Sequence, residues 1–568
     1  MHTCYFDIES NGLLDKADRL ICIGYSTNGA APKIAFTPEQ IKEALREIEL
    51  ADIVVGHNIM TFDIPMLHKL YPDWKGPSGC IRDTLVMARL CRPDIRDEDF
   101  QTPNFPSELV GSHGLKAWGH RLGMPKGVEM EDVVDFYSLE YTDELGEYCQ
   151  QDVRITVELY RKLSAECPSE DSLILEHSFA SAIASQMRNG FGFDREAAGR
   201  LYSELAGERD RLVRELQADV PPAEQKLKTK TKLIPFNPAS RKQIAEAMRQ
   251  MYGWVPTEFT PGGEAKVDES VLGSLDYPIA KKLSQYLLIQ KRIGMLAEGD
   301  EAWMKVERGG RIYGSVNHNG AVTGRCTHRS PNMAQVPACG SPYGKECRSL
   351  FIPRDNCVLV GVDAAGLELR CLAHYMAKYD DGAFAKELLE GDIHTANQKA
   401  AGLPTRNDAK SFIYAFLYGA GPAKLGSIVG GGYAEGKELQ QRFLTKVPAL
   451  KKLKQAVEQA CRRGYLVGID GRRLRIRSEH SALNTLLQSA GAVAMKQATV
   501  IMSASATAYL ARQVAHIHDE VQWEVPETTS ELWAQFCARA ITRAGEDLGF
   551  RCRLDGEAKI GRNWAETH

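Results

Sequence analysis

Two separate groups of acidic side chains are the residues of this sequence best suited to do chemistry. The first group consists of Asp7, Glu9, Asp63 and Asp152. The second group consists of Asp363, Asp519 and Glu520. Phosphoryl transfer uses carboxylates gathered in this way because they hold two divalent cations about 4 Å apart around an in-line displacement. Two such groups in one chain predict two reactions on one substrate.

Local spacing predicts that the first group converges. Asp7 and Glu9 are two apart in a predicted strand, so their side chains share a face. Tyr148 and Asp152 are four apart in a predicted helix and also share a face. Four carboxylates suit two Mg²⁺ or Mn²⁺ ions, and the tyrosine can orient an attacking water. Taken alone, Asp63 or Asp152 would be read as an ordinary surface charge.

The second group is predicted to lie at the edge of a sheet. The apolar run 357–362 predicts a buried strand that delivers Asp363 to its end. Asp519 and Glu520 precede an alternating segment that predicts a strand, so these acids are expected at a hairpin tip. An acidic turn without function is the alternative reading of that tip.

Between the parts of the second group, cations and aromatics recur at helical spacing. They are Arg406, Lys410, Tyr414 and Tyr418. Residues four apart line one face of a helix, and a stripe that packed in a core would be aliphatic. This stripe suits a triphosphate neutralised by the two cations while Tyr414 packs on sugar or base. An amphipathic helix with a basic side is the alternative.

The overall composition is that of a folded protein of several domains. The chain has 568 residues, of which 43% are hydrophobic and 25% charged, and this length predicts three or four domains. A net charge of −4 neither predicts nor excludes a polyanion partner, because local basic surface decides that. With no CxxC pair, no signal peptide and no 18-residue apolar run, we expect free thiols and a cytoplasmic protein without membrane contact.

Element patterns divide the chain. Strands and helices alternate to about residue 165, which predicts an α/β domain. Helical patterns follow, interrupted by the lysine-rich segment 221–238, which we expect to be a loop or linker. A helix-rich block is predicted from about 375 to 465.

The first acidic group lies in motifs that resemble those of a nuclease family. DIES, HN-x3-FD and Y-x3-D occur in the order and spacing of DEDD-type 3′–5′ exonucleases whose third motif carries a tyrosine. The resemblance implies a ribonuclease-H-like sheet and metal-dependent hydrolysis from a single-stranded 3′ end. Every acid of the family set is present, so an active exonuclease is expected.

The second group lies in motifs that resemble those of a polymerase family. DAAGLELR at 363–370, RNDAKSFIYAFLYGAG at 406–421 and HDE at 518–520 resemble motifs A, B and C of family A DNA polymerases. The likeness is to the replicative polymerases of T-seven-type phages, and it covers nearly the whole chain. The resemblance implies an α/β multidomain fold in which a ribonuclease-H-like exonuclease domain precedes a right-hand polymerase domain.

The resemblance also assigns roles. Asp363 and Asp519 would be metal ligands assisted by the Ala364 carbonyl, with Glu520 beside the site. Glu368 would exclude a ribose 2′-OH, which marks the product as DNA. The residues expected to hold the incoming nucleotide are Arg406, Lys410, His394, Tyr414 and Tyr418. The residues expected to contact primer or template are Arg325, Asn332, Asn484, Gln488 and His518.

The same resemblance divides the chain into functional parts. They are the exonuclease (1–165), connecting helices and thumb (166–310), a first part of the palm (311–374), the fingers (375–475) and a second part of the palm (476–568). Two Mg²⁺ ions are expected at each active site, with Mn²⁺ as a substitute. Expected partners are primer–template DNA and dNTPs, with a helicase–primase or single-stranded-DNA-binding protein as candidates, and the chain is expected to be a monomer in a bacterial cytoplasm.

Two details have specific consequences. Tyr414 stands at the sugar-selecting position, and its hydroxyl could replace a missing 3′-OH, so dideoxynucleotides should be accepted. T-seven-type enzymes carry a long thumb insertion that binds host thioredoxin, whereas the corresponding gap here holds only a short lysine-rich segment. We therefore expect no thioredoxin dependence. The lysines Lys226, Lys228, Lys230 and Lys232 would either track duplex phosphates or form a solvated loop.

Three other functions compete with a proofreading polymerase. A stand-alone 3′–5′ exonuclease with a nucleic-acid-binding C-terminal region would not need Asp363, Asp519, Lys410 and Arg406. A non-catalytic scaffold would not need the acids at all. A single-subunit RNA polymerase would share the palm chemistry, but Glu368 and the exonuclease motifs favour DNA.

Overall fold

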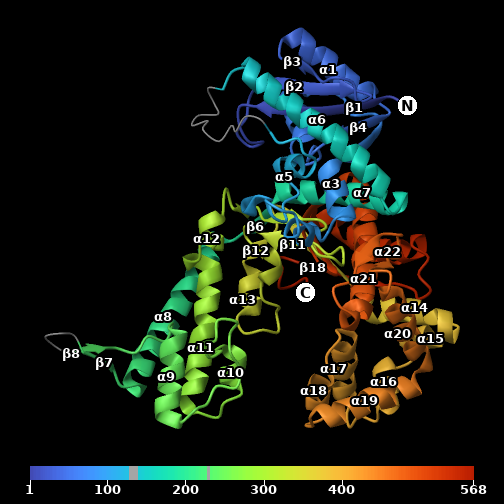
Figure 1. The fold of residues 1–568 in the computed structure, drawn as a ribbon. Coiled ribbons are helices and arrows are strands. Elements are labelled where there is room, and N and C mark those ends of the chain that lie inside the picture. The colour runs from blue at the N-terminus through green and yellow to red at the C-terminus, as the bar shows by residue number, and fades with distance from the viewer. Residues whose placement is uncertain (127–138, 227–230) are drawn as a thin grey trace. The chain divides into compact units, whose positions relative to one another are not determined.

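The computed structural model describes residues 1–126, 139–226 and 231–568 (Figure 1). The chain forms two compact units. The first consists of Met1–Asn189, Val316–Thr327 and Val360–Ile560. The second consists of Gly190–Ser315, His328–Leu359 and Gly561–His568.

A five-stranded mixed sheet organises the N-terminal part of the first unit. Its strands, in the order β3-β2-β1-β4-β5, are β3 (Lys33–Ala35), β2 (Leu20–Thr27), β1 (Thr3–Ser10), β4 (Ile53–Gly56) and β5 (Cys80–Asp83). β1 pairs antiparallel with β2 and parallel with β4, so the sheet is of the mixed kind expected of a ribonuclease-H-like domain.

Helices accompany this sheet. They are α1 (Pro38–Leu50), α2 (Asp63–Leu70), α3 (Thr84–Cys91), α4 (Ile95–Asp99), α5 (Leu115–Arg121) and α6 (Asp143–Glu166). α6 crosses the sheet over β1 and β2, as Figure 1 shows. It begins where the Thr142 side chain accepts from the Leu145 amide, which satisfies one of the amides that a helix start leaves unpaired. This placement brings the residues of one α6 face over β1.

A four-stranded sheet lies in the C-terminal part of the first unit. Its order is β16 (Arg512–Ile517), β17 (Glu520–Pro526), β13 (Cys357–Ala364) and β18 (Gly556–Gly561). β13 is apolar and buried as far as Val362, in agreement with the predicted strand. Helices α7 (Glu170–Asn189), α14 (Leu367–Asp380), α21 (Glu479–Ser505) and α22 (Ser530–Asp547) accompany this sheet.

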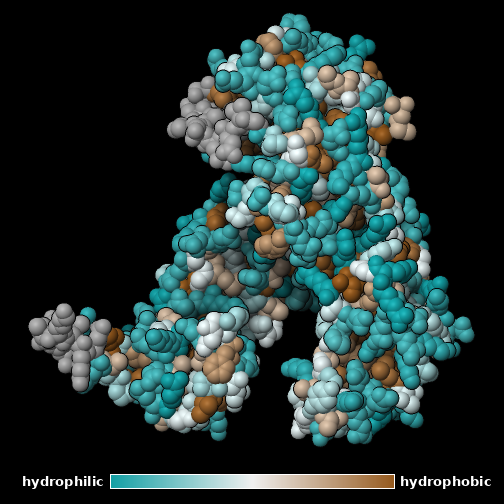
Figure 2. All heavy atoms as spheres, viewed as in Figure 1, coloured by the Kyte–Doolittle hydropathy of each residue, from teal (hydrophilic) through white to brown (hydrophobic). Residues whose placement is uncertain are grey.

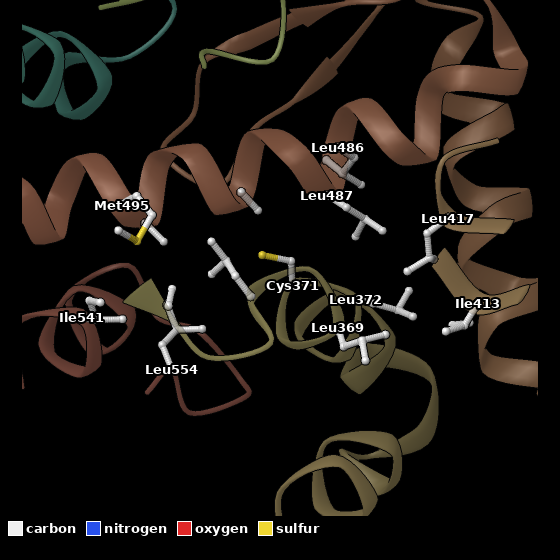
Figure 3. Packing of buried hydrophobic residues seen from close by; sticks show 14 of the residues in the cluster. Leu369, Cys371, Leu372, Ile413, Leu417, Leu486, Leu487, Met495, Ile541 and Leu554 are labelled. Atoms are coloured by element: carbon white, nitrogen blue, oxygen red, sulfur yellow. The ribbon is translucent and has the colours of Figure 1, made fainter. Parts of the chain in front are cut away.

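The predicted helix-rich block is present between these strands. It consists of α15 (Ala383–Glu390), α16 (Ile393–Ala401), α17 (Arg406–Leu417), α18 (Pro422–Ser427), α19 (Tyr433–Lys446), α20 (Pro448–Cys461) and the hairpin β14 (Tyr465–Val467) and β15 (Arg473–Arg475). Figure 3 shows why α17 is fixed: Ile413 and Leu417 point toward Leu372 of α14 and Leu487 of α21 within one buried cluster. Burial of this side of α17 leaves its polar side outward.

The second unit is mainly helical. Its helices are α8 (Arg195–Asp219), α9 (Arg241–Tyr252), α10 (Glu269–Gly273), α11 (Pro278–Ile293), α12 (Trp303–Val306) and α13 (Gly344–Ser349). A small sheet joins β12 (Phe351–Ile352), β6 (Phe191–Phe193) and β9 (Arg311–Ile312). The short strands β10 (Ser315–Asn317) and β11 (Thr327–Arg329) flank the segment 318–326 in the sequence.

The prediction that 221–238 is a loop or linker is wrong in part. β7 (Ala223–Lys226) and β8 (Thr231–Ile234) pair as an antiparallel hairpin, with Lys226 opposite Thr231. The lysine-rich composition concealed a strand pattern because polar side chains can occupy both faces of an exposed hairpin. Lys228 and Lys230 lie outside the described residues, and no side-chain position is described for Lys226.

The face of the molecule drawn in Figure 2 is mainly polar. On the face in Figure 2, hydrophobic residues appear as scattered small areas among hydrophilic ones. Among the described residues, no helix is long and apolar enough to cross a membrane. All fourteen cysteines are free thiols, as expected.

Candidate active sites

The first acidic group comes together on the face of the N-terminal sheet that α6 covers. Asp7 and Glu9 project from β1, Asp63 is the first residue of α2, and Asp152 lies on α6. Asp63 Oδ1 accepts a hydrogen bond of 3.2 Å from the Ile8 amide, which ties the start of α2 to β1. Carboxyl oxygens of Asp7 and Glu9 and the Cys149 Sγ all lie within 4.8 Å of one another. The structure therefore confirms that this group converges.

Burial raises the pKa values of these four carboxyls, and neighbouring carboxylates raise those of Asp7, Glu9 and Asp63 further. Burial raises the pKa of Asp7 well above its usual range, and the charges of Asp152, Asp63 and Glu9 raise it further. Burial, followed by the charge of Asp152, raises the pKa of Glu9 to about 7. The buried Oδ1 of Asp152 has no hydrogen-bond partner. A buried cluster of acids with raised pKa values and an unused oxygen is short of positive charge, and divalent cations supply it.

A lysine that the sequence analysis missed enters this cluster. Lys126 Nζ lies 2.5 Å from Asp152 Oδ2 and donates to the Tyr148 hydroxyl at 2.8 Å. Burial raises the pKa of Tyr148, and the hydrogen bond from Lys126 opposes that rise. Lys126 belongs to none of the three recognised motifs, so only the fold could bring it here.

Asp83 is a second residue that the motifs did not reveal. It is buried at the end of β5, and its carboxylate accepts from the amides of Asn58, Met60 and Leu85 at 2.8, 3.1 and 2.9 Å. Asn58 has a positive φ of 66° and needs this support, because left-handed backbone is unfavourable for residues other than glycine. Asp83 thus fixes the loop that leads to Asp63. The sequence signal was an aspartate at a strand end immediately before a helix.

The second acidic group also comes together, at the edge of the C-terminal sheet. Asp363 lies near the end of β13, and the Ala364 amide donates to the Asp519 carbonyl at 3.1 Å. Ile517 pairs with Glu520, so His518 and Asp519 form a two-residue hairpin turn. Asp519 thus lies at the predicted hairpin tip, whereas Glu520 is already the first residue of β17. The main chain thus places Asp519 beside the end of β13.

Glu520 differs from Asp519 in its surroundings. It is only 7% exposed, and its Oε1 accepts from the Gln522 amide group at 2.6 Å. A carboxylate already held by a neighbouring side chain is a weaker candidate for a metal ligand than the turn residue next to it. This agrees with its expected position beside the site.

The cationic stripe lies on α17 as its spacing predicted. The helix begins at Arg406, after Thr405 and Asp408 form a reciprocal cap, and Tyr418 follows its last residue. Arg406 and Lys410 are exposed, whereas Tyr414 is half-buried. The ring of Tyr414 lies 6.5 Å from that of His394 on α16.

Arg406 already has a partner. Its Nε donates to Asp392 Oδ2 at 2.9 Å, and Asp392 caps the start of α16 through the amides of His394 and Thr395. The hydrogen bond from Arg406, followed by that from the Thr395 hydroxyl, keeps the pKa of Asp392 below its usual range. An anion that binds Arg406 must therefore compete with Asp392.

Glu368 connects α17 to the second acidic group. The Tyr418 hydroxyl donates a hydrogen bond to Glu368 Oε1. The Arg325 Nη2 lies 3.9 Å from that same oxygen and 3.8 Å from Asp519 Oδ1. Burial raises the pKa of Asp519, and the positive charge of Arg325 opposes the rise. Arg325 therefore stands between Asp519, an expected metal ligand, and Glu368, the residue expected to select the sugar.

The other predicted DNA-contacting residues are distributed over the fold. Asn484 and Gln488 lie four apart on α21 and are both partly exposed, so they share one helix face. His518 occupies the hairpin turn with a positive φ of 57°. Asn332 belongs to the second compact unit, where its side chain accepts from the Ala334 amide.

Comparison with known proteins decides the family. The model of DNA polymerase family A matches residues 208–566. The chain belongs to DNA polymerase family A. This membership disfavours the stand-alone exonuclease.

Curated relatives of this family A polymerase include phage enzymes. It is 35% identical to the DNA-directed DNA polymerase of Enterobacteria phage T3, over 99% of both chains. It is also 35% identical to that of Escherichia phage T7, again over 99% of both chains. The thermostable DNA polymerase I of Thermus aquaticus is 27% identical, over 78% of this chain and 54% of its own length.

A solved structure shows the same fold. The POL domain of Pol1 from M. smegmatis, in complex with a DNA primer–template and dNTP, superposes with a TM-score of 0.78 at 18% identity. The match covers 100% of this family A polymerase and 96% of that chain. The fold predicted from the sequence is confirmed.

Proposed function

We propose that this family A polymerase extends a DNA primer on a template and removes misincorporated nucleotides with its own 3′–5′ exonuclease. The observation that carries the proposal is the convergence of Asp7, Glu9, Asp63 and Asp152 in a chain that also holds Asp363 beside Asp519. Four acids with raised pKa values have no evident use in a polymerase except to hold cations for a second reaction.

Both acidic groups fit divalent cations, and Mg²⁺ is the proposed ion, with Mn²⁺ as a substitute. In the exonuclease site Asp7, Glu9, Asp63 and Asp152 would hold the metals. In the polymerase site Asp363, Asp519 and the Ala364 carbonyl would do so. Bound metal ions would supply neutralisation of the phosphate charge and a lower pKa of the nucleophile. Oxygen-only ligand sets suit Mg²⁺ and Mn²⁺ better than softer metals.

In the polymerase site the protein side chains bind and select the nucleotide. Lys410 and Arg406 face solvent on one side of α17 and would bind the triphosphate by charge-assisted hydrogen bonds. Tyr414 would pack on the sugar, next to His394. Glu368, held by Tyr418, would occupy the space that a ribose 2′-OH needs.

In the exonuclease site the protein side chains orient water. The Tyr148 hydroxyl oxygen, fixed by Lys126, would accept a hydrogen bond from the attacking water and orient it toward the scissile phosphate. Asp152 carries both the ion pair to Lys126 and a buried oxygen without a partner, so it can bind a cation while Lys126 remains bound. The product would be a nucleotide released from the 3′ end.

The proposed biological role is replication of a phage genome in a bacterial host. Its support is the 35% identity to the T3 and T7 phage polymerases along nearly the whole chain. The alignment with the T3 enzyme spans 709 positions, whereas this chain has 568 residues. This chain therefore lacks residues at many positions that the T3 enzyme fills. A shorter thumb would dispense with thioredoxin, and the hairpin of β7 and β8 would contact duplex phosphates in its place. Replisome partners would be a helicase–primase or a single-stranded-DNA-binding protein.

Primer extension tests the proposal. A labelled primer–template is incubated with dNTPs and Mg²⁺ and with the wild type, Asp519→Ala, or the double variant Asp7→Ala/Glu9→Ala. Asp519→Ala should lose synthesis and keep degradation, and the double variant should show the reverse. Loss of both activities in either variant, with the fold intact by circular dichroism, would contradict the assignment of two sites.

A further inference from the structure

Helix α7 contains a fully buried carboxylate that three distant segments bind. Glu176 is 0% exposed, and its Oε1 accepts from Lys496 Nζ at 2.5 Å and lies 2.8 Å from Arg472 Nη2. Its Oε2 lies 3.1 Å from His318 Nδ1. Lys496 comes from α21, Arg472 from the turn between β14 and β15, and His318 from the segment 318–326. No part of the proposed chemistry uses these residues.

The charges of this cluster balance. Arg472 also binds Asp470, with its Nε 2.9 Å and its Nη2 2.7 Å from Asp470 Oδ2. Two acids thus face two bases. Burial raises the pKa of Glu176, but the positive charges of Lys496 and Arg472 outweigh it and keep that pKa well below its usual range. Removal of one member leaves a buried charge without compensation, which is strongly destabilising locally.

The cluster lies directly against the turn that carries Arg325. A Cβ atom built on Gly324 would lie 2.6 Å from Arg472 Nη1, so the guanidinium packs on the Gly324 backbone, whose φ is +80°. The amides of Gly320 and Ala321 both donate to the Arg325 carbonyl at 3.2 Å, which closes the turn. His318 is bound to Glu176 a few residues earlier. Both ends of this turn therefore rest on the ionic cluster.

We propose that Glu176, His318, Asp470, Arg472 and Lys496 are positioning residues that hold Arg325 between Glu368 and Asp519. The proposal rests on the proposed polymerase function, in which Arg325 contacts primer or template as the resemblance implies. The cluster acts through the turn. Arg472 packs against the backbone of Gly324, and Glu176 binds both Arg472 and His318, so it holds the two ends of the turn in place. Arg325 Nη2 lies 3.8 Å from Asp519 Oδ1 and 3.9 Å from Glu368 Oε1. The proposal is that the buried ionic cluster fixes these distances by holding the turn in place.

A double-mutant cycle tests this coupling. Single-turnover extension is measured for the wild type, Glu176→Gln, Arg325→Ala and the double variant, at varied primer–template and dNTP concentrations. Glu176→Gln should lower the ratio of the extension rate to the primer–template dissociation constant by roughly 10- to 100-fold. A loss of this size is expected when an active-site group is misplaced by about 1 Å. The double variant should resemble Arg325→Ala alone, because effects on one shared path do not add.

Controls separate positioning from loss of stability. Asp99→Asn removes a carboxylate that Arg121 binds at 2.8 and 2.9 Å in a similarly buried pair of the N-terminal domain, far along the chain from Arg325. It should reduce thermal stability without affecting extension. Lys496→Met, which removes one charge and leaves Arg472 bound to Glu176, serves where Glu176→Gln fails to fold. Hydrolysis of single-stranded DNA should remain at the wild-type rate in all Glu176 and Lys496 variants.

The double-mutant cycle distinguishes coupling through Arg325 from independent effects of the two substitutions. Independent, multiplicative effects of Glu176→Gln and Arg325→Ala would overturn the coupling, as would unchanged extension constants in a destabilised Glu176→Gln. Wild-type extension by Arg325→Ala would instead remove the proposed role of Arg325 at the primer end. The positioning role is supported if Glu176→Gln and Lys496→Met lower extension to a similar degree and neither lowers it further when combined with Arg325→Ala.

Discussion

The Tyr418 hydroxyl donates a hydrogen bond to Glu368, and this bond joins the end of α17 to the start of α14. Glu368 is the residue expected to exclude ribonucleotides, so the bond orients the excluding group. α17 also carries the cations that face solvent. The residue expected to select the sugar is therefore bonded to the end of the helix that carries the residues expected to bind the triphosphate.

Tyr418→Phe should weaken discrimination against ribonucleotides. Without the hydroxyl, Glu368 can rotate away from the sugar. A hydrogen bond to a charged group contributes about 1.5 kcal/mol, so discrimination should fall roughly 10-fold. Competitive incorporation of rNTP and dNTP measures this ratio. Glu368→Ala should have a larger effect, and equal discrimination by Tyr418→Phe and the wild type would rule out the orienting role.

Tyr414 should allow incorporation of dideoxynucleotides. Its hydroxyl can replace the hydrogen bond of the missing 3′-OH. Tyr414→Phe should therefore reduce ddNTP incorporation by on the order of 100-fold, while dNTP incorporation changes little. Strong discrimination against ddNTPs by the wild type, unaltered in Tyr414→Phe, would show that another group selects the sugar.

Asp392→Asn should lower the KM for dNTPs. Asp392 binds Arg406 in the absence of nucleotide, and an asparagine retains the helix cap while it loses the charge. Both residues are exposed, so the KM should fall only by roughly twofold to fivefold, and less at high salt. Steady-state kinetics at two salt concentrations measure it. An increased KM would indicate that Asp392 holds Arg406 in the binding orientation.

Lys126→Met should alter two properties of the exonuclease in opposite directions. Loss of a positive charge next to Asp152 should strengthen metal binding, so half-saturation should require less Mg²⁺. Loss of the hydrogen bond to Tyr148 should reduce the rate at saturating Mg²⁺ by roughly 10-fold. Titration of single-stranded DNA hydrolysis with Mg²⁺ separates the two. Tyr148→Phe is the matched control and should change only the rate.

Glu176→Gln should change how stability depends on pH. The folded pKa of Glu176 is lowered, so its contribution is present above the unfolded value of about 4.3 and is lost as pH falls below it. The variant should be less stable at neutral pH by roughly 3 kcal/mol. It should also lose less stability than the wild type between pH 5 and 3, as thermal unfolding at each pH would measure. A parallel decline of both proteins would assign the acid sensitivity to other carboxylates.

The sequence predicted the residues within each motif better than the contacts between motifs. Asp7 and Glu9 on a strand, the stripe on α17 and the turn of Asp519 all follow from local periodicity, which the structure confirms. Lys126 and Glu176 could not be predicted, because their partners are distant in the chain and depend on packing. The prediction of a loop or linker at 221–238 is wrong in part for a related reason: pairing between strands, rather than their composition, defines the hairpin.

The two-residue turn of His518 and Asp519 limits how the gene can vary. A single inserted codon there would shift the register of β17 against β16 and move every side chain of one strand to the opposite face. An insertion that preserves the pairing of β16 with β17 must therefore add its residues outside this turn, whose length of two residues fixes the register of the two strands.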